Sequence, residues 1–272
     1  MSFLDKLTIA SQARDSIVCV GLDPEPERIP GHLGTGPQAA LRFLRRIVAA
    51  TSDVACAYKP NLAFFEQYGS AGMDLLGLTL QAIPSDIPVI LDGKRGDVPN
   101  TSVAYAEALF GRWRADAATV APYLGLDSIA PFCDRGYALV LARTSNPGAA
   151  DLQDLEVGGR PLYEHVVSTV VERFPAERCG FVVGSTWPAE ARRVRELAPD
   201  RLFLLPGVGA QGGNVAEAVR AAADAEGGGV LPSASRSVLY ASREADFEQA
   251  AAAAARSLRD AANQARLALE PR

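Results

Sequence analysis

The chain has 272 residues with 27 basic and 32 acidic side chains, a formal net charge of −5. With 48% hydrophobic and 22% charged residues, it can bury a large core, and wholesale disorder is excluded. The acidic balance gives no electrostatic basis for binding nucleic acid or an anionic membrane. Of the 27 basic residues only three are lysines, namely Lys6, Lys59 and Lys94. Because arginine supplies positive charge elsewhere, each lysine raises the question of amine chemistry.

The first residues, MSFLDKLTIASQAR, form an amphipathic helical pattern in which we expect Lys6 to be an ordinary helix-surface residue. The pattern lacks the uninterrupted apolar core of a signal peptide. No uncharged apolar run approaches the roughly 20 residues of a membrane span, so we expect a soluble cytoplasmic protein. Cys19, Cys56 and Cys179 lie in or beside apolar runs, and the four cysteines form no CxxC pair. This indicates buried reduced thiols rather than disulfides or a metal site.

Short apolar runs alternate with helical patterns along the chain. We predict strands at 17–22, 54–59, 89–92, 118–121, 138–142, 180–183, 202–205 and 229–231. We predict helices at 37–50, 62–83, 98–113, 126–135, 161–174, 189–197, 214–225 and 243–269. Apolar strands joined by helices indicate a parallel sheet covered by helices. Eight such units predict an α/β fold of (β/α)8 TIM-barrel type, whose usual length is about 250 residues. A doubly wound open sheet shows the same alternation. No linker divides the chain, so residues 1–272 should form one domain.

The segment VILDGKRGDVPNTSVAYA, residues 89–106, runs from an apolar strand directly into charged residues. Asp92 and Lys94 are two apart on this strand, so we expect them to share a face. The preceding strand ends in ACAYKPN, which places a lysine at its tip. The C-terminal tips of parallel strands are neighbours, and such folds bind ligands there. We therefore predict a cluster of alternating charge, formed by Lys59, Asp92, Lys94 and Asp97.

Such a cluster suits a reaction that develops negative charge. The ammonium groups separate the carboxylates, and the carboxylates keep the ammonium groups protonated, which makes a preorganised electrostatic array. Lysine, unlike arginine, can also give a proton to a developing carbanion. A carboxylate placed against a substrate carboxylate would penalise the ground state and favour loss of CO2. The motif D-x-K-x-x-D alone is equally consistent with structural ion pairs. Two of the three lysines occur here, which favours function.

Two consecutive segments near the C-terminus carry phosphate-binding signals. LFLLPGVGAQGGN, residues 202–214, is a strand followed by a glycine-rich turn and a helix start. Glycines let backbone N–H groups approach a ligand, and a helix N-terminus adds partial positive charge. GGGVLPSASRSVLYA repeats this arrangement, with Arg236 after a strand. Loops after strands 7 and 8 are the usual phosphate site of such barrels. Glycine-rich turns also occur merely to turn the chain, but two in succession favour phosphate binding.

Other segments add weaker signals. LARTSNPG, after the fifth strand, is either a simple turn or a source of neutral donors, Thr144, Ser145 and Asn146. Asp23 in VCVGLDP is a hydroxyl acceptor or a turn residue. The two histidines lie in a loop and a helix without a cysteine or carboxylate pattern, which argues against a metal site and a His-based triad. Two long loops follow strands and should lie on the face that carries the active site, namely 24–36 and 146–160.

These motifs resemble the orotidine 5′-phosphate decarboxylase family, in its longer bacterial branch, type 2. The similarity spans nearly the whole chain, in GLDP at 21–24, YKPN at 58–61, LDGKRGD at 91–97, TSNPG at 144–148 and PGVGAQGG at 206–213. Arg236 then follows the eighth strand. The resemblance implies a (β/α)8 barrel that converts orotidine 5′-phosphate to UMP and CO2 in de novo pyrimidine biosynthesis, without a metal or organic cofactor.

The resemblance also implies roles for individual residues. Lys94 would protonate the C6 carbanion as CO2 leaves, Asp92 would stand against the substrate carboxylate, and Lys59 and Asp97 would complete the array. Lys59 would also contact a ribose hydroxyl. Family members are commonly homodimers in which the Asp and Thr just after the third strand cross into the neighbour's site. The implied substrate-binding residues are Asp23 at the ribose, Ser145 at the pyrimidine edge, Pro206, Gln211, Gly212 and Arg236 at the phosphate end, and Thr101 across the interface.

Other functions stay open at this point. A Mg²⁺-dependent sugar-phosphate decarboxylase or aldolase of the same superfamily keeps a similar charged strand end, although the Lys59 strand and the PGVGAQGG loop favour a nucleotide. A Schiff-base aldolase needs a lysine of depressed pKa, which Asp92 and Asp97 oppose. A non-catalytic phosphate-ligand-binding barrel would have no need for four alternating charges. Which long loop closes over the site, together with Gln211, also stays open.

Overall fold

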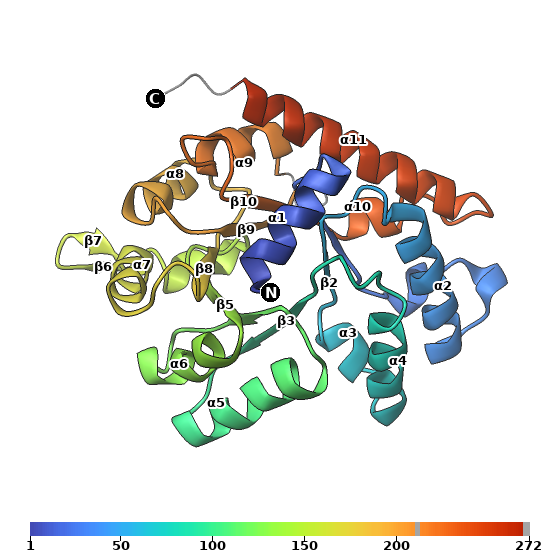
Figure 1. The fold of residues 1–272 in the computed structure, drawn as a ribbon, viewed down its shortest axis with the longest axis horizontal. Coiled ribbons are helices and arrows are strands. Elements are labelled where there is room, and N and C mark those ends of the chain that lie inside the picture. The colour runs from blue at the N-terminus through green and yellow to red at the C-terminus, as the bar shows by residue number, and fades with distance from the viewer. Residues whose placement is uncertain (210–212, 269–272) are drawn as a thin grey trace.

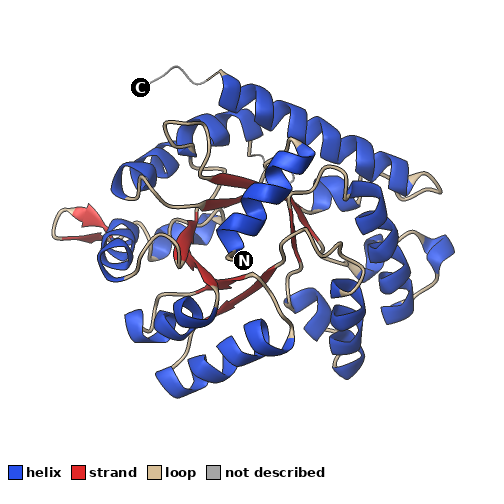
Figure 2. Ribbon diagram, viewed as in Figure 1, coloured by secondary structure: helices blue, strands red, loops and turns tan. Residues whose placement is uncertain are grey.

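The computed structural model describes residues 1–209 and 213–268. Its centre is a ring of parallel strands: β1 (Cys19–Gly21), β2 (Ala57–Lys59), β3 (Ile90–Arg95), β4 (Ala117–Val120), β5 (Tyr137–Leu141), β8 (Cys179–Val182), β9 (Phe203–Pro206) and β10 (Val230–Ala234). They are ordered β2-β1-β10-β9-β8-β5-β4-β3. Parallel bridges from Tyr58 to Val89 and from Asn61 to Asp92 join the two ends. All eight predicted strands are present, and because the ring closes, the open-sheet alternative is wrong (Figure 2).

Helices surround this ring (Figures 1 and 2). They are α2 (Gly36–Thr51), α3 (Ala63–Glu66), α4 (Ser70–Leu80), α5 (Pro99–Ala106), α6 (Leu126–Arg135), α7 (Leu162–Arg173), α8 (Pro188–Leu197), α9 (Val215–Ala222), α10 (Arg236–Leu239) and α11 (Phe247–Leu267). The single helix predicted at 62–83 is two helices, because Gly69 has φ 61° and turns the backbone between them. The helix predicted at 98–113 is α5 followed by a π-helical turn over Glu107–Arg112. The architecture is that of a (β/α)8 barrel.

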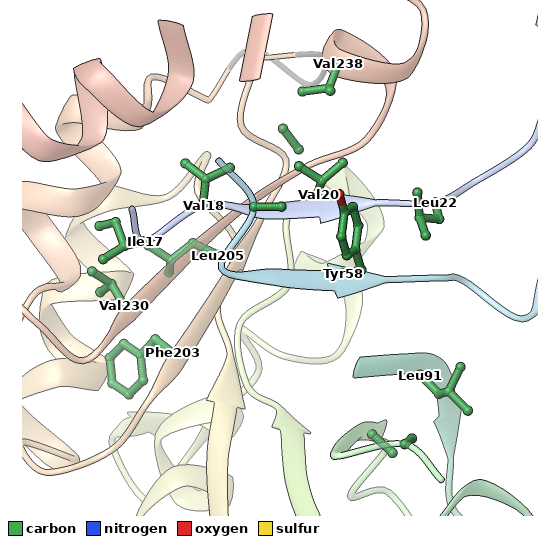
Figure 3. Packing of buried hydrophobic residues seen from close by; sticks show 14 of the residues in the cluster. Ile17, Val18, Val20, Leu22, Tyr58, Leu91, Phe203, Leu205, Val230 and Val238 are labelled. Atoms are coloured by element: carbon green, nitrogen blue, oxygen red, sulfur yellow. The ribbon is translucent and has the colours of Figure 1, made fainter. Parts of the chain in front are cut away.

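Apolar side chains form two layers because successive residues of a strand point to opposite faces. On β9, Phe203 and Leu205 belong to the outer layer, between the strands and the helices, whereas Leu204 belongs to the barrel interior. Val18 and Cys19 divide in the same way at β1. Figure 3 shows part of the outer layer around β1 and β2. The four cysteines are buried and free, as predicted for Cys19, Cys56 and Cys179.

Helix α1 (Phe3–Arg14) covers one end of the barrel and lies across the ring of strands in Figure 1. Phe3, Leu7 and Ala10 share one helical face and join the interior layer. The ring of Phe3 packs on Tyr137 with 4.9 Å between centroids. Since Tyr137 begins β5, α1 closes the end of the barrel at which the strands start.

Lys6 anchors this helix. Its Nζ lies 3.0 Å from Oδ2 of Asp116, the residue before β4, and Asp116 also accepts the Val89 N–H at 2.8 Å. The expectation that Lys6 is an ordinary surface residue is therefore wrong. The ion pair joins α1 to two neighbouring strands. Within residues 1–209 and 213–268, no helix has the length and apolarity needed to cross a bilayer.

Candidate active site

A cavity of about 630 Å³ opens at the other end of the barrel, where the strands finish. Its size falls in the range of ordinary small-molecule sites. Side chains from the ends of seven strands line it, including Lys59 of β2, Asp92 and Lys94 of β3, Thr119 of β4, Leu141 of β5, Val182 of β8, Pro206 of β9 and Ser233 of β10. The following loops add Asp23, Ser145 and Arg236. The cavity thus brings together seven of the predicted site residues. They are Asp23, Lys59, Asp92, Lys94, Ser145, Pro206 and Arg236.

Asp92 is the centre of the charged cluster. Its Oδ1 accepts from Lys94 Nζ at 2.6 Å and from Thr119 Oγ1 at 2.8 Å. Its Oδ2 accepts from Lys59 Nζ at 2.8 Å and, at a longer 3.5 Å, from Asn61 Nδ2. Each carboxylate oxygen therefore faces one ammonium group and one neutral donor. This arrangement holds an ionised carboxylate rigidly in a site shielded from water.

The two lysines differ in exposure. The side chains of Lys59 and Asp92 are 5% and 9% exposed, whereas that of Lys94 is 47% exposed. Burial alone would raise the pKa of Asp92, but Lys59 and Lys94 outweigh it and lower that pKa below its usual value. Burial alone would lower the pKa of Lys59, but Asp92 and Asp23 outweigh it and raise that pKa. Lys59 and Asp92 are therefore both charged at neutral pH, and Lys94 is the lysine that a ligand can reach.

Strand β3 is irregular where it carries these charges. Leu91 pairs with Ala118, and Arg95 pairs with Val120. Between these two pairs, β3 has two more residues than β4. Lys94 has φ 46°, in the left-handed region of backbone conformation that residues other than glycine rarely adopt. The predicted proximity of Asp92 and Lys94 is confirmed, but a bulge produces it rather than the simple alternation of a flat strand.

Asp97 lies apart from the cluster in this chain. Its Oδ1 accepts the Val98 N–H at 2.7 Å, and its carbonyl accepts the Ser102 hydroxyl at 2.9 Å. Thr101 follows in α5 and contacts Asn100 at 3.5 Å. The described wall of the cavity includes neither Asp97 nor Thr101. One chain therefore assembles three of the four predicted charges, and the role of Asp97 in a partner's site stays a prediction.

The turns after β9 and β10, which are predicted to bind phosphate, form part of the cavity wall. Pro206, Gly207 and Val208 line one side, with φ 99° at Gly207, and Arg236 lines the other at the start of α10. No acidic side chain within the described parts of the chain forms an ion pair with Arg236. Its guanidinium is thus available to an anion. Two residues of the predicted phosphate site, Gln211 and Gly212, lie outside the described residues.

Helix α9 begins with a side-chain cap. The side chain of Asn214 accepts the N–H groups of Ala216 and Glu217, at 2.9 and 3.2 Å. These amides belong to the first turn of the helix, which the Asn214 side chain therefore caps. The expectation that this helix N-terminus binds phosphate stays a prediction.

Asp23 and Ser145 occupy opposite sides of the cavity. Asp23 Oδ1 accepts the Asn61 N–H at 3.2 Å. The Tyr240 hydroxyl donates to the Asp23 carbonyl at 2.8 Å and accepts the Glu25 N–H at 2.6 Å, so it fixes the backbone on both sides of Pro24. A Cβ at Gly184 would come within 2.7 Å of the Ser145 backbone, so only glycine permits this close approach.

The prediction missed residues that fix the long loop after β5. Buried Arg143 donates to both carboxylate oxygens of Asp154, at 2.7 and 2.9 Å. Gln153, which lines the cavity, accepts the Thr144 N–H at 2.8 Å and donates to the Thr144 hydroxyl at 3.0 Å. The loop over 146–160, with its small hairpin β6 (Glu156–Val157) and β7 (Arg160–Pro161), is thus tied to the end of β5. An arginine directly after an apolar strand was the available signal.

Over residues 1–209 and 213–268, no group of three or more His, Cys, Asp and Glu side chains is arranged to hold a metal ion.

Comparison with known proteins indicates the family of the chain. Residues 16–254 match the model of the family described as orotidine 5′-phosphate decarboxylase / HUMPS. Orotidine 5′-phosphate decarboxylase of Cellvibrio japonicus is 48% identical over 275 residues, covering 98% of this chain and 100% of the relative. That of Azoarcus sp. is 47% identical over 268 residues, covering 97% and 99%.

Solved structures show the same relationship. The structure of Leishmania donovani OMP decarboxylase superposes with a TM-score of 0.87 at 38% identity. The match covers 99% of this chain and 100% of that one. The barrel is therefore a fold that this chain shares with that structure. The chain belongs to the orotidine 5′-phosphate decarboxylase / HUMPS family.

Proposed function

We propose that this chain is a cytoplasmic decarboxylase that converts orotidine 5′-phosphate to UMP and CO2 in de novo pyrimidine biosynthesis, without a cofactor. Family membership supports this reaction. The observation that carries it is the position of Asp92, ionised between Lys59 and Lys94 inside the cavity. This array suits a substrate that loses a carboxylate and accepts a proton.

The array divides the chemistry among its members. The bond between C6 and the carboxylate carbon breaks, its electron pair stays on C6, and a proton from Lys94 Nζ forms the new C6–H bond. Asp92 opposes the substrate carboxylate, and this repulsion ends when neutral CO2 forms. Lys59 keeps Asp92 ionised from the buried side. Lys94 suits the donor role because it is the more exposed lysine of the cavity.

Substrate binding is distributed around the same cavity. Asp23 and Lys59 contact ribose hydroxyls, Ser145 contacts the pyrimidine edge, and Arg236 holds the phosphate. The turn after β9 completes the phosphate site with Pro206, Gln211 and Gly212. The phosphate lies far from the bond that breaks, but its binding energy fixes the base against the charges.

A homodimer completes the site in this proposal, with Asp97 and Thr101 of each chain entering the cavity of the other. The Ala121 N–H donates to the Arg95 carbonyl at 2.8 Å, which places the loop after β4 beside the loop after β3. These two segments and α5 expose large apolar side chains near Asp97, namely Val98, Val103, Tyr123 and Leu124. Exposed apolar side chains on these adjoining segments favour burial against a second copy.

The direct test follows the absorbance of orotidine 5′-phosphate with purified protein and identifies UMP and CO2 as products. We expect turnover that survives EDTA, and we expect Lys94→Ala to lose it while keeping the wild-type circular dichroism spectrum. No loss of substrate at micromolar enzyme would overturn the proposal. Turnover that EDTA removes and Mg²⁺ restores would instead indicate the metal-dependent chemistry of a sugar-phosphate enzyme.

A mixing experiment tests the shared site. Lys94→Ala and Asp97→Ala should each be inactive alone, but a mixture refolded or exchanged together should recover activity at about a quarter of its sites, because half of the dimers are mixed and each has one intact site. A mixture that stays inactive while wild-type protein is dimeric would contradict the placement of Asp97 in the partner's site.

A further inference from the structure

Thr119 stands out in the cavity because it places a hydroxyl in an otherwise apolar strand. It lies on β4, which reads AATV, and is 1% exposed. Its neighbours Ala118 and Val120 belong to the outer layer, so the alternation of the strand points Thr119 inward. The side chain lines the cavity beside β3.

The hydrogen-bond partners of Thr119 determine the direction of both of its bonds. The Lys94 N–H can only donate, so the Thr119 oxygen accepts this bond, at 3.0 Å. The Thr119 proton is then free to donate to Asp92 Oδ1, which lies 2.8 Å away. The ionised carboxylate can only accept, so the two assignments are consistent.

Through these two bonds, Thr119 acts on both the backbone and the side chain of Lys94. The backbone of Lys94 has φ 46° at the bulge of β3, and Thr119 binds its amide there. The ammonium group of Lys94 lies 2.6 Å from Asp92 Oδ1, the same oxygen to which Thr119 donates. One hydroxyl therefore constrains the unusual backbone of the lysine and the carboxylate that its side chain contacts.

We propose that Thr119 is a positioning residue that holds Lys94 and Asp92 in the arrangement required for proton transfer. This inference rests on the proposed decarboxylase function and extends it. Thr119 supplies no proton to the substrate and acts through its two partners. Valine has the shape of threonine but would leave the Lys94 N–H and Asp92 Oδ1 each without one partner.

The test compares Thr119→Val with Thr119→Ser, which keeps the hydroxyl and removes the methyl group. Steady-state decarboxylation gives kcat and KM, calorimetric titration gives the Kd of UMP, and circular dichroism gives Tm. We expect Thr119→Val to lower kcat about tenfold to a hundredfold, the scale of a small misplacement of reacting groups. Its Kd for UMP should match wild type, because phosphate and ribose contacts remain. Thr119→Ser should keep kcat close to wild type.

Each outcome bears on a different part of the inference. Wild-type kcat in Thr119→Val would overturn the positioning role, and so would an equal loss of kcat in Thr119→Ser, since packing of the methyl group would then be the cause. If Thr119→Val does not fold, Thr119→Ala removes the same hydroxyl with less bulk and should show the same loss of kcat. An inactive wild type would overturn the proposed function itself, which the Thr119 variants alone would not.

Discussion

Replacing either lysine of the cluster should stop turnover, but only one replacement should strongly destabilise the fold. In Lys59→Met, Asp92 stays buried and loses an ammonium partner 2.8 Å away, whose own side chain is 5% exposed. Breaking such a buried pair costs about 3 kcal/mol of unfolding free energy. In Lys94→Met the carboxylate keeps Lys59 and Thr119, and the lost partner is 47% exposed. We expect that change to cost about 1 kcal/mol or less.

Urea unfolding at neutral pH, followed by circular dichroism, measures both changes. For a chain of this size, about 3 kcal/mol corresponds to a fall in Tm of roughly 6 to 12 °C. Decarboxylation assays on the same preparations should find both variants inactive. Equal destabilisation by the two substitutions, or a Lys59→Met protein as stable as wild type, would refute the reasoning from burial.

Three further predictions concern pH, phosphate and the other lysine. The lowered pKa of Asp92 and the raised pKa of Lys59 should keep the stability difference between wild type and Lys59→Met constant from about pH 5 to pH 9. Unfolding measured across pH should show this stability difference decrease only as pH falls below the ordinary aspartate pKa of about 3.9 or rises above the ordinary lysine pKa of about 10.4. Arg236→Ala should lower kcat/KM about tenfold to a hundredfold with Tm unchanged, and an unchanged kcat/KM would remove Arg236 from the phosphate site. Lys6→Met should cost about 1 kcal/mol or less in urea unfolding, because its contact with Asp116 is partly exposed, and a change in kcat would contradict its purely structural role.

Sequence patterns were sufficient for the barrel and for most of its charged site. Each strand is a short apolar run that needs burial on both faces, so its position can be predicted without knowledge of its neighbours. Lys59 and Asp92 stand at or near the ends of such runs, where any closed parallel barrel brings strand tips together. The placement of these residues in one cavity followed from topology alone.

The remainder depends on contacts that no local pattern encodes. Thr119 appears in sequence as an ordinary β-branched strand residue, and its role arises only because β4 pairs with the bulged part of β3. The helical periodicity of residues 62–83 continues through Gly69, so the periodicity did not reveal the break between the two helices there. Lys6 finds Asp116 across 110 positions of the chain. Asp97 is a different case, because its expected partner belongs to another copy.

The covering of the barrel by α1 has a consequence for ligand traffic. Phe3, Leu7 and Ala10 close the end at which the strands start, so the cavity communicates with solvent through the opposite opening. Substrate entry and the departure of both products then share one passage. In the proposed mode of binding, CO2 forms next to Asp92, and the phosphate group of UMP is held at the turns after β9 and β10. The proposed reaction therefore gives the small neutral product and the charged one the same route to solvent.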